Sequence, residues 1–378
     1  MAERSVDVLV IGGGPGGSTA AALLAASGRS VVVLERARFP RFRIGESLLP
    51  MGRAIYERLG VADEIDRRFI HKHGAHIVEG ATGREVTVEF GHATGVPYRY
   101  AYQVSRGEHD ELLLRNARRA GAEVREGWTA ERVLFEGERA VGVAAREVTE
   151  PGAGGPRPSS ETIRCRQLID ATGRAALLAR SLSLVTPDPV LCNSAVFSHY
   201  RGVARLPGIH EGSITVGVFE GGWIWIIPFK GDVTSVGAVM QHAYWRARKM
   251  PPQELLEEAL GACPTIRERM RGAARILPVM AEGSFSYKAT RFAGPGYFLC
   301  GDAAAFLDPV FSSGVLLSMA SAVDIAELVG SVLRGTLDES RAAATYERQA
   351  RAAASTFWRF VYGFYDPAFF DVFMSPRP

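Results

Sequence analysis

Residues 6–35 read VDVLVIGGGPGGSTAAALLAASGRSVVVLE, and this stretch decides the fold. Residues 6–11 are a short apolar run rich in β-branched side chains, which predicts a strand buried on both faces. The glycines that follow satisfy the pattern G-x-G-x-x-G, and the small side chains of residues 18–27 predict a closely packed helix. Residues 30–34 predict a second strand, which ends at Glu35. Together these elements predict a parallel α/β unit that binds an adenine dinucleotide.

Each glycine of the turn is expected to do a separate job. Gly12 permits the tight turn, Gly14 lets the backbone approach a pyrophosphate, and Gly17 lets the helix lie close to the strand. Gly16 lies among them at the start of the helix, whose free N–H groups would face the phosphates. Glu35 follows Gly17 at a spacing that suits a hydrogen bond from a ribose hydroxyl.

The composition describes an ordinary globular protein. Of 378 residues, 47% are hydrophobic and 22% charged, and the net charge is only +3, so we expect neither disorder nor a nucleic-acid partner. Residues 8–28 are uncharged, but six glycines and a proline favour strand, turn and helix over a membrane span or a signal peptide. The four cysteines are scattered and form no CxxC pair: Cys165, Cys192, Cys263 and Cys300. This spacing argues against a disulfide scaffold and against a metal site. Scattered cysteines are typical of a reducing compartment, so we expect a cytoplasmic location.

Four later segments indicate which dinucleotide is bound. Residues 36–50 read RARFPRFRIGESLLP, residues 103–106 read QVSR, residues 169–173 read IDATG and residues 297–304 read YFLCGDAA. In this order they resemble the FAD-dependent monooxygenase superfamily. The resemblance implies FAD as cofactor. The motif G-x-G-x-x-G does not occur a second time after a strand, so we expect no separate NAD domain.

The same resemblance assigns roles to individual residues. The first segment would lie along the flavin. The arginine of QVSR, which Asp110 follows four positions later, would contact the cofactor. Asp302 would accept a hydrogen bond from a ribityl hydroxyl. The helix that begins near Gly314 would point at the flavin. The predicted cofactor-binding residues are therefore Gly12, Gly14, Gly16, Gly17, Glu35, Arg36, Arg43, Ser47, Arg106, Asp302 and Gly314.

A tryptophan pair indicates the reaction. Residues 221–228 read GGWIWIIP, and Trp223 and Trp225 are two positions apart on a predicted strand, so their rings face the same side. An aromatic pair inside a sheet core would have the same spacing. Beside the flavin motifs, W-x-W-x-I-P, which ends at Pro228, resembles the flavin-dependent halogenases. In that family the two rings stand as a wall between flavin and substrate.

A second motif, DPVFSSG at residues 308–314, resembles the halide-binding turn of these enzymes. Backbone N–H groups near a helix N-terminus form an anion nest, and the resemblance assigns the halide to Ser313 and Gly314. A side-chain cap made by Ser312 or Ser313 is compatible with this role. Phe311 stands where the tryptophan-type halogenases have a glutamate, which favours the branch that acts on phenolic or pyrrolic substrates.

Lys72 is the third element of the predicted reaction site. It lies in HKHGA at residues 71–75, after a charged helix predicted over residues 53–68. The resemblance implies that it is the family's essential lysine, which orients hypohalous acid or captures the halogen as a haloamine. Its position alone favours a solvated surface lysine. His71 and His73 are proton-carrier candidates by proximity only, and no metal set includes them.

The predicted fold class is α/β, with a Rossmann-like FAD-binding domain of the glutathione-reductase and p-hydroxybenzoate-hydroxylase type. The FAD domain would be discontinuous, over residues 1–74, 100–175 and 290–335. Residues 75–99 and 176–289 would form an inserted antiparallel substrate sheet. A Pro-, Gly- and Ser-rich segment at residues 150–160 predicts a mobile loop.

Residues 336–378 would form a short helical tail that is unusually aromatic. Packing against the body explains this composition, and a wall of the substrate site or a docking surface is the alternative. Nine aromatic residues fall within residues 357–373: Phe357, Trp358, Phe360, Tyr362, Phe364, Tyr365, Phe369, Phe370 and Phe373.

The motifs together indicate an FAD-dependent halogenase with Lys72, Trp223, Trp225 and Pro228 at its reaction site. A separate flavin reductase would supply reduced FAD, chloride or bromide would be co-substrate, and the acceptor would be a small aromatic compound, free or tethered to an acyl or peptidyl carrier protein. Two interpretations stay open. One is an aromatic hydroxylase or geranylgeranyl-reductase-like oxidoreductase that oxidises NADPH unaided. The other is a non-catalytic flavin-binding partner that has lost turnover with its shortened tail.

Overall fold

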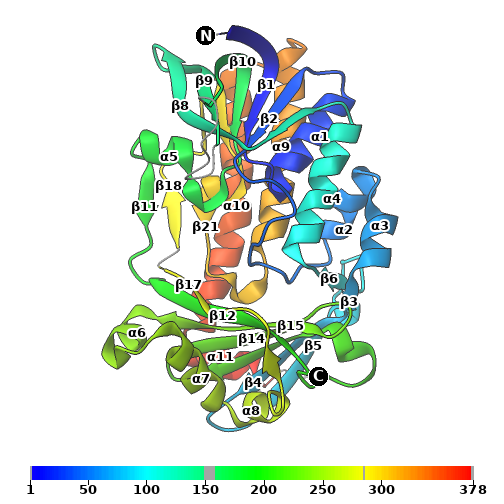
Figure 1. The fold of residues 1–378 in the computed structure, drawn as a ribbon, viewed down its shortest axis with the longest axis vertical. Helices are drawn as coiled ribbons and strands as arrows, with labels where there is room; N and C mark the ends of the chain where they lie inside the picture. The colour runs from blue at the N-terminus through cyan, green and yellow to red at the C-terminus, as the bar shows by residue number, and fades with distance from the viewer. Residues whose placement is uncertain (1, 149–157, 284–285, 376–378) are drawn as a thin grey trace.

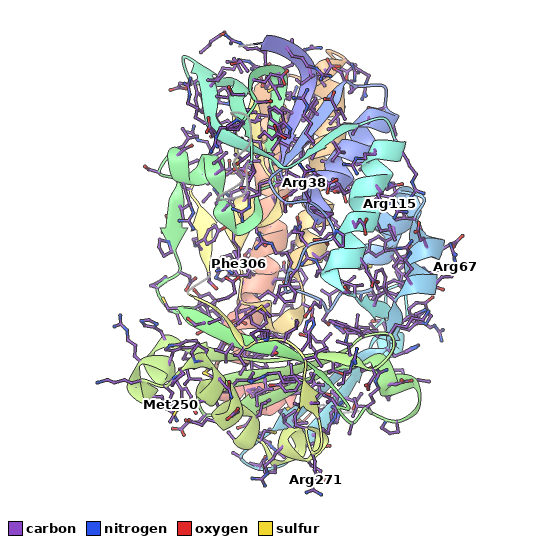
Figure 2. The ribbon with its side chains drawn as sticks, viewed as in Figure 1. Arg38, Arg67, Arg115, Met250, Arg271 and Phe306 are labelled. Carbon is purple, nitrogen blue, oxygen red and sulfur yellow. The ribbon has the colours of Figure 1, made fainter. Side chains whose placement is uncertain are left out.

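The computed structural model describes residues 2–148, 158–283 and 286–375. Two large sheets lie at opposite ends of the molecule, and the long helices α9 (Gly314–Leu333) and α10 (Glu339–Phe364) run between them (Figure 1). Most of the predicted loop at residues 150–160 falls outside the described residues. Figure 2 shows Arg67 and Arg271 at the outer edge of the molecule, pointing away from the body.

The first sheet is built on the predicted nucleotide-binding strands. Strand β1 (Ala2–Ile11) pairs in parallel with β2 (Val31–Glu35) on one side and with β10 (Ser160–Asp170) on the other. The strand order is β19-β20-β10-β1-β2-β7, and a β8–β9 hairpin joins the outer half of β10. Helix α1 and the β8–β9 hairpin share one hydrophobic cluster with the central strands, which explains the uninterrupted apolar runs of those strands. The remaining strands are β7 (Glu123–Glu126), β8 (Trp128–Glu136), β9 (Arg139–Glu147), β19 (Ala293–Gly294) and β20 (Tyr297–Leu299).

Helix α1 (Pro15–Ala26) packs between the first sheet, α4 (Arg106–Arg119) and α9. Its small side chains are buried almost completely, as close helix packing requires. Among the described residues, α9 alone is long and apolar enough to cross a membrane, but it packs as a partly buried helix between α1 and α10.

The second sheet has the order β16-β12-β15-β14-β13-β4-β5, with β17 beside β12. Its pairs are antiparallel except for β13 and β4, which run parallel, with Val216 opposite Ile77. The sheet is therefore mixed, because β4 enters from the first domain rather than from a neighbouring hairpin. Its strands are β4 (Gly74–Glu79), β5 (Glu85–Glu89), β12 (Asn193–Arg201), β13 (Ile214–Phe219), β14 (Gly222–Pro228), β15 (Val233–Gln241), β16 (Ala274–Arg275) and β17 (Met280–Glu282).

The two faces of the second sheet bury different partners. Ile224 and Ile226 of β14 pack against α7 (Pro252–Gly261) and α8 (Pro264–Arg269), beside which α6 (His242–Arg248) follows β15. The alternate residues of β14 face the C-terminal half of α10 and α11 (Pro367–Phe373). Because strand side chains alternate, one strand serves both hydrophobic clusters.

Smaller elements connect the two sheets. The helix predicted over residues 53–68 is in fact two helices, because Gly60 adopts a positive φ of 69° and turns the chain between them. The predicted boundary at residue 290 falls between β18 and β21, which pair with each other in one small sheet of the order β11-β18-β21. The elements not yet named are α2 (Gly52–Arg58), α3 (Ala62–Arg68), α5 (Leu177–Ser181), β3 (Ile70–Lys72), β6 (Ala101–Gln103), β11 (Val185–Pro187), β18 (Tyr287–Ala289), β21 (Ala305–Phe306), and the 3₁₀ turns η1 (Phe90–His92), η2 (Gly173–Ala175), η3 (Gly208–Gly212), η4 (Gly301–Ala303) and η5 (Pro309–Phe311).

Candidate functional site

The glycine turn packs so tightly that three of its glycines leave no room for a side chain. A Cβ at Gly12 would overlap the carbonyl of Ala171, and Gly12 itself has a positive φ of 101°. A Cβ at Gly17 would overlap the carbonyl of Gly12, and one at Gly16 would overlap the hydroxyl of Ser318 on α9. These glycines let α1 lie against both β1 and α9.

Gly14 differs from its neighbours because the space in front of it is open. The nearest atom to a Cβ placed there is Arg41 Nη2, at 3.6 Å. An open position at the N-terminus of α1, beside a cationic side chain, fits the pyrophosphate of a dinucleotide.

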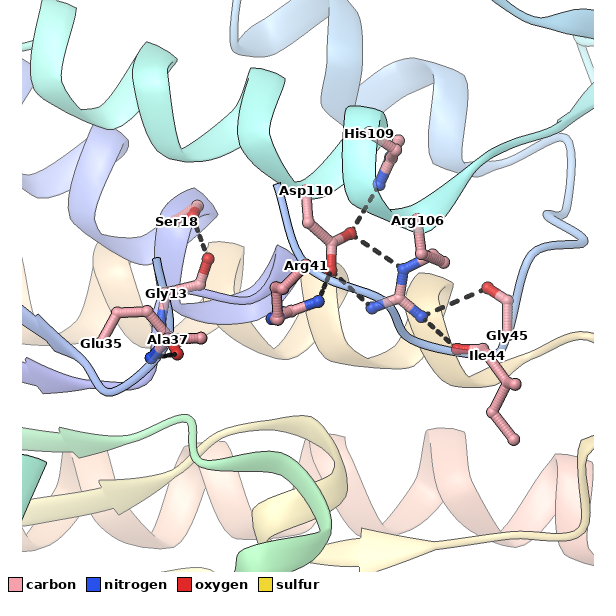
Figure 3. A network of polar contacts seen from close by, with 10 residues as sticks. All are labelled: Gly13, Ser18, Glu35, Ala37, Arg41, Ile44, Gly45, Arg106, His109 and Asp110. Atoms are coloured by element: carbon pink, nitrogen blue, oxygen red, sulfur yellow. Dashed lines mark hydrogen bonds and ion pairs between the residues drawn. The ribbon is translucent and has the colours of Figure 1, made fainter. Parts of the chain in front are cut away.

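Glu35 lies beside this turn, at the end of β2. Its Oε2 accepts a hydrogen bond of 2.7 Å from the Gly13 N–H, and its Oε1 accepts one of 2.8 Å from the Ala37 N–H (Figure 3). Since each carboxylate oxygen can accept two hydrogen bonds, both keep capacity for a ribose hydroxyl.

Arg106 holds the loop that was predicted to lie along the flavin. It forms a bidentate ion pair with Asp110, at 2.9 and 2.8 Å, and donates to the carbonyl of Ile44 at 2.7 Å (Figure 3). Arg41 reaches the same carboxylate at 2.9 Å. Burial alone would raise the pKa of Asp110, but Arg106 and His109 together hold it well below its usual value. The carboxylate therefore stays charged and fixes the loop.

The loop carries more positive charge than its ion pairs neutralise. Burial lowers the pKa of Arg43, and so do the neighbouring guanidinium groups of Arg41, Arg36 and Arg106. Arg36, at the start of the loop, is exposed. A bound pyrophosphate would relieve this mutual repulsion, so the charge pattern also fits a dinucleotide.

Asp302 lies in η4, directly after β20, where α/β folds place ligand-binding side chains. Burial raises its pKa to about 6, although Arg106, Arg174 and Arg43 draw it in the opposite direction. Its Oδ1 lies 3.9 Å from the position of a Cβ on Gly314, the first residue of α9. The tertiary structure thus brings together the acid and the helix N-terminus that were predicted to face the flavin.

The predicted halide turn ends at this same helix N-terminus. Ser312 adopts a left-handed φ of 57°, and Ser313 is buried. Among the described residues, no acceptor is found for the N–H groups of Ser313 and Gly314. The predicted side-chain cap by a serine is wrong. Instead Asp308 caps η5, accepting from the Val310 N–H at 3.2 Å, and α9 keeps its first N–H groups free.

Trp223 and Trp225 form one aromatic surface on β14, with ring centroids 5.9 Å apart. Both are buried, and Pro228 ends the strand. Each indole N–H is used: Trp225 donates to Ser235 Oγ at 3.1 Å, and Trp223 donates to the hydroxyl of Tyr365 at 3.1 Å. We call this pair the tryptophan wall.

The C-terminal tail packs directly on the tryptophan wall. Phe364 and Phe370 belong to the same hydrophobic cluster, whereas Phe360 and Phe369 remain 49% and 41% exposed. Half-buried Phe311 of the predicted halide turn meets the rings of Phe360 and Phe364. The tail therefore joins the second sheet to the halide turn.

A buried polar network completes that joint, and sequence reasoning missed it. Tyr365 donates to Asp308 Oδ2 at 2.9 Å while accepting from Trp223 and, at 2.8 Å, from Asn193. Asn193 also donates to Asp308 at 2.8 Å, and burial raises the pKa of Asp308. No local signal marks these residues, because the partners come from β12, β14, η5 and α10.

Lys72 is completely enclosed, with only 1% of its surface exposed. Its Nζ donates to Ser47 Oγ at 2.8 Å and to the Leu48 carbonyl at 3.0 Å, and lies 5.3 Å from the ring centre of Phe90. Among the described residues no carboxylate pairs with the ammonium, and burial lowers the pKa of Lys72 to about 7. An amine that is part neutral at physiological pH can act as a nucleophile.

The flanking histidines lie outside this enclosed environment. His71 stacks on Tyr100 with ring centres 4.2 Å apart and reaches Asp66 at 3.1 Å. His73 is half-buried. In the part of the chain that the structure describes, no group of three or more His, Cys, Asp or Glu side chains could hold a metal ion.

The glycine turn, the cationic loop and the acid at the helix N-terminus define an FAD-binding protein. Residues 5–361 match the family described as "FAD binding domain". A tryptophan 2-halogenase of Chondromyces crocatus is 36% identical, with the alignment covering 91% of this chain and 65% of that protein. A 1H-pyrrole-2-carbonyl-[peptidyl-carrier protein] chlorinase of Pseudomonas fluorescens is 29% identical, over 97% of this chain and 84% of that protein.

A solved structure agrees with these relatives. The structure of the myxobacterial chondrochloren halogenase superposes with a TM-score of 0.90 and 37% identity, covering 96% of this chain and 83% of that one. The chain belongs to the flavin-dependent halogenases within the FAD-binding monooxygenase family. The predicted family and fold class are thus confirmed. The chain spans about two thirds of the length of the tryptophan 2-halogenase.

Proposed function

We propose that the chain is an FAD-dependent halogenase that transfers a halogen, through Lys72, to an electron-rich aromatic ring. The observation that carries this proposal is the buried amine of Lys72. It has a pKa of about 7 and is hydrogen-bonded to Ser47 of the loop predicted to lie along the flavin. A lysine without a carboxylate partner destabilises a fold, which favours a chemical role for it.

The residues present fit FAD in three places. The open face of Gly14 and the surrounding arginines suit the pyrophosphate, Glu35 suits the ribose, and Asp302 suits a ribityl hydroxyl. Reduced FAD, when bound, would supply the electrons that activate O₂, so that a halide is oxidised to hypohalous acid. We propose that a separate flavin reductase provides the reduced form, since the chain has no second dinucleotide-binding motif.

The halide would bind at the N-terminus of α9. The N–H groups of Ser313 and Gly314 supply donors and partial positive charge there. Chloride and bromide are both candidates, because the site is made of backbone N–H groups rather than a sized cage of side chains.

Trp223 and Trp225 would keep the organic substrate away from the cofactor, while Pro228 ends the strand that carries them. Lys72 would then retain hypohalous acid. As an ammonium it donates a hydrogen bond to the acid, and as a neutral amine it takes the halogen and releases water. When the halogen passes to the ring, the ring loses its proton, which returns to the Lys72 nitrogen and regenerates the amine, and this completes an electrophilic substitution.

The acceptor class follows from Phe311 and from the relatives. Phe311 leaves no carboxylate base at the position where the tryptophan-type halogenases have a glutamate, so we propose a ring activated by its own hydroxyl or nitrogen. The Pseudomonas fluorescens relative acts on a pyrrole bound to a peptidyl carrier protein. We propose a phenolic or pyrrolic acceptor, presented free or on a carrier protein.

The Lys72→Ala variant tests this function. It should bind FAD and consume reduced flavin and O₂ at near the wild-type rate, yet form no halogenated product, because the oxidant is no longer held. Lys72→Arg should be inactive or nearly so, since a guanidinium cannot become the neutral amine. Lys288→Ala, at an exposed lysine, is the matched control. Mass spectrometry of products with chloride, bromide and a panel of free and carrier-bound aromatics provides the measurement.

The same assay separates the competing functions. Halogenation at the wild-type rate in Lys72→Ala would refute the role of Lys72. A hydroxylated product, with rapid flavin reduction by NADPH alone, would favour a hydroxylase. Bound FAD without any product would favour a non-catalytic partner.

A further inference from the structure

A cavity of about 240 Å³ lies where the first domain meets the second sheet. Its apolar walls are the rings of Phe69 and Phe229 with the side chain of Val233. The volume is below the ~300 Å³ at which sites for drug-sized ligands begin, so it suits a compound with one ring. Its remaining lining residues are Gln103, Ser105, Glu108, His199 and Lys230.

Gln103 is a lining residue of this cavity and has a buried polar atom without a partner. The residue is 0% exposed, and its Nε2 donates to the Gly212 carbonyl at 3.0 Å. Among the described residues, nothing donates a hydrogen bond to its Oε1. A buried acceptor without a partner is costly, which indicates that a ligand supplies the missing donor.

Strand pairing places Gln103 beside Lys72. Strand β3 pairs with β6 so that Ile70 lies opposite Gln103 and Lys72 lies opposite Ala101. Residues two apart on a strand share a face, so the side chains of Lys72 and Gln103 lie on the same face of this small sheet. Ser47, which accepts the hydrogen bond from Lys72, forms a bridge with Gln103.

The opposite wall of the cavity is also held rigidly. His199 is within 2.9 Å of Glu46 in the predicted flavin loop, and its ring packs edge-on against Phe229 at 5.3 Å. The cavity therefore lies between residues of the first domain and the second sheet. Glu46 of the flavin loop holds its His199 wall from behind, and Lys72 lies on the neighbouring strand but not in the lining.

We infer that this cavity binds the ring of the acceptor, and that Gln103 Oε1 accepts the hydrogen bond of its phenolic O–H or pyrrolic N–H. Phe69 and Phe229 pack on the ring. The inference rests on the proposed function for the identity of the ligand, and it names the residue that selects rings bearing a donor. A ring whose donor is methylated would leave Gln103 Oε1 buried and unpaired.

The experiment measures binding without turnover, on protein loaded with oxidised FAD and without halide. Phenol and its methyl ether, anisole, are titrated by calorimetry into the wild type and Gln103→Met. The wild type should prefer phenol about tenfold, since one ordinary hydrogen bond corresponds to roughly that factor. In Gln103→Met, which keeps the length but loses the acceptor, the preference should disappear.

Gln167→Met is the matched control, because Gln167 is also buried with an unpartnered Oε1 but lies on β10 and does not line the cavity. It should keep the preference. Val233→Phe provides a second variant, which fills the cavity from β15 and should abolish phenol binding while FAD remains bound.

A tenfold preference that persists in Gln103→Met, or phenol binding that survives Val233→Phe, would overturn the site. The site would also be refuted if Gln103→Met lost bound FAD but kept its preference for phenol, because Gln103 would then bind the cofactor. Selective phenol binding without halogenation in the product assay would refute the proposed function and leave the site standing.

Discussion

Lys72 shows how much one residue depends on its surroundings. In the sequence it lies between two histidines, a position typical of a solvated lysine. In the structure β3 pairs with β6, and the side chain passes under residues 47–48, where it is 1% exposed. The same amine that would be inert and charged at a surface therefore has a pKa of about 7.

The lowered pKa of Lys72 predicts how stability depends on pH. The pKa is about 7 in the fold, against 10.5 for an ordinary lysine, so between these values the unfolded chain binds more protons. The free energy of unfolding should therefore rise with pH over this interval, by up to about 1.4 kcal/mol per pH unit. The penalty for burying the ammonium is fully present below pH 7 and disappears as the pH approaches 10.5.

Urea unfolding of the wild type and of Lys72→Met at pH 7 and pH 9 measures this effect. The wild type should gain stability relative to the variant as the pH rises. Lys288→Met, at an exposed lysine, should show no such change. If the difference in free energy of unfolding between the wild type and Lys72→Met is the same at both pH values, Lys72 remains charged in the fold.

At the scale of elements, the glycine turn combines two requirements that a substitution can separate. A Cβ at Gly17 would overlap the backbone of Gly12, so this glycine serves folding. A Cβ at Gly14 would meet only Arg41 Nη2 at 3.6 Å, so this glycine leaves space for a ligand. The distinction follows from the packing of α1 against β1, not from the motif itself.

Gly14→Val should therefore abolish FAD binding without unfolding the protein, because its side chain would occupy the place of the pyrophosphate. The flavin absorbance of purified protein, together with the thermal unfolding midpoint of the FAD-free form, checks both parts. Gly17→Ala is the contrasting variant and should lower the stability of the FAD-free form by several kcal/mol, the range for steric overlap in a packed interior. Retention of flavin in Gly14→Val would refute the assignment of the turn.

At the scale of the whole molecule, the tail links parts that are distant in the sequence. The first half of α10 packs in the core of the first domain through Ala342 and Tyr346, and its second half packs on the tryptophan wall. Tyr365, just after α10, bonds both Trp223 and Asp308 of the halide turn. We infer that the tail positions the halide turn relative to the wall.

Tyr365→Phe removes only the hydroxyl at the centre of this network. Asp308 then loses one of its donors, so the turn should loosen and the KM for halide should rise about three- to tenfold with FAD binding unchanged. Tyr362→Phe is the control, because Tyr362 anchors the same helix through Asp188, away from the turn. Equal effects of the two variants on the halide KM would show that the tail acts only as a structural support.

Much of the fold was predictable because its signals are local. The glycine turn and the first two strands are set by steric demands within a few residues. The structure has them where expected, except that β1 begins at Ala2, four residues before the predicted start. Two expectations failed for lack of long-range information. The second sheet is mixed because β4 pairs in parallel with the distant β13, and Ser313, although it is the N-cap residue of α9, makes no side-chain cap.

The candidate site divides in the same way. The sequence by itself determined the α/β unit, the glycine turn and the side of β14 that both tryptophans occupy, because backbone sterics and strand periodicity act over short distances. Only the tertiary structure decided that Lys72 is buried without a counter-charge, that Tyr365 joins the wall to the halide turn, and that Gln103 lacks a donor. Burial and hydrogen bonding at these positions depend on contacts between segments that are far apart in the chain. Such contacts form only when the whole molecule packs, so no single stretch of residues carries a pattern that predicts them.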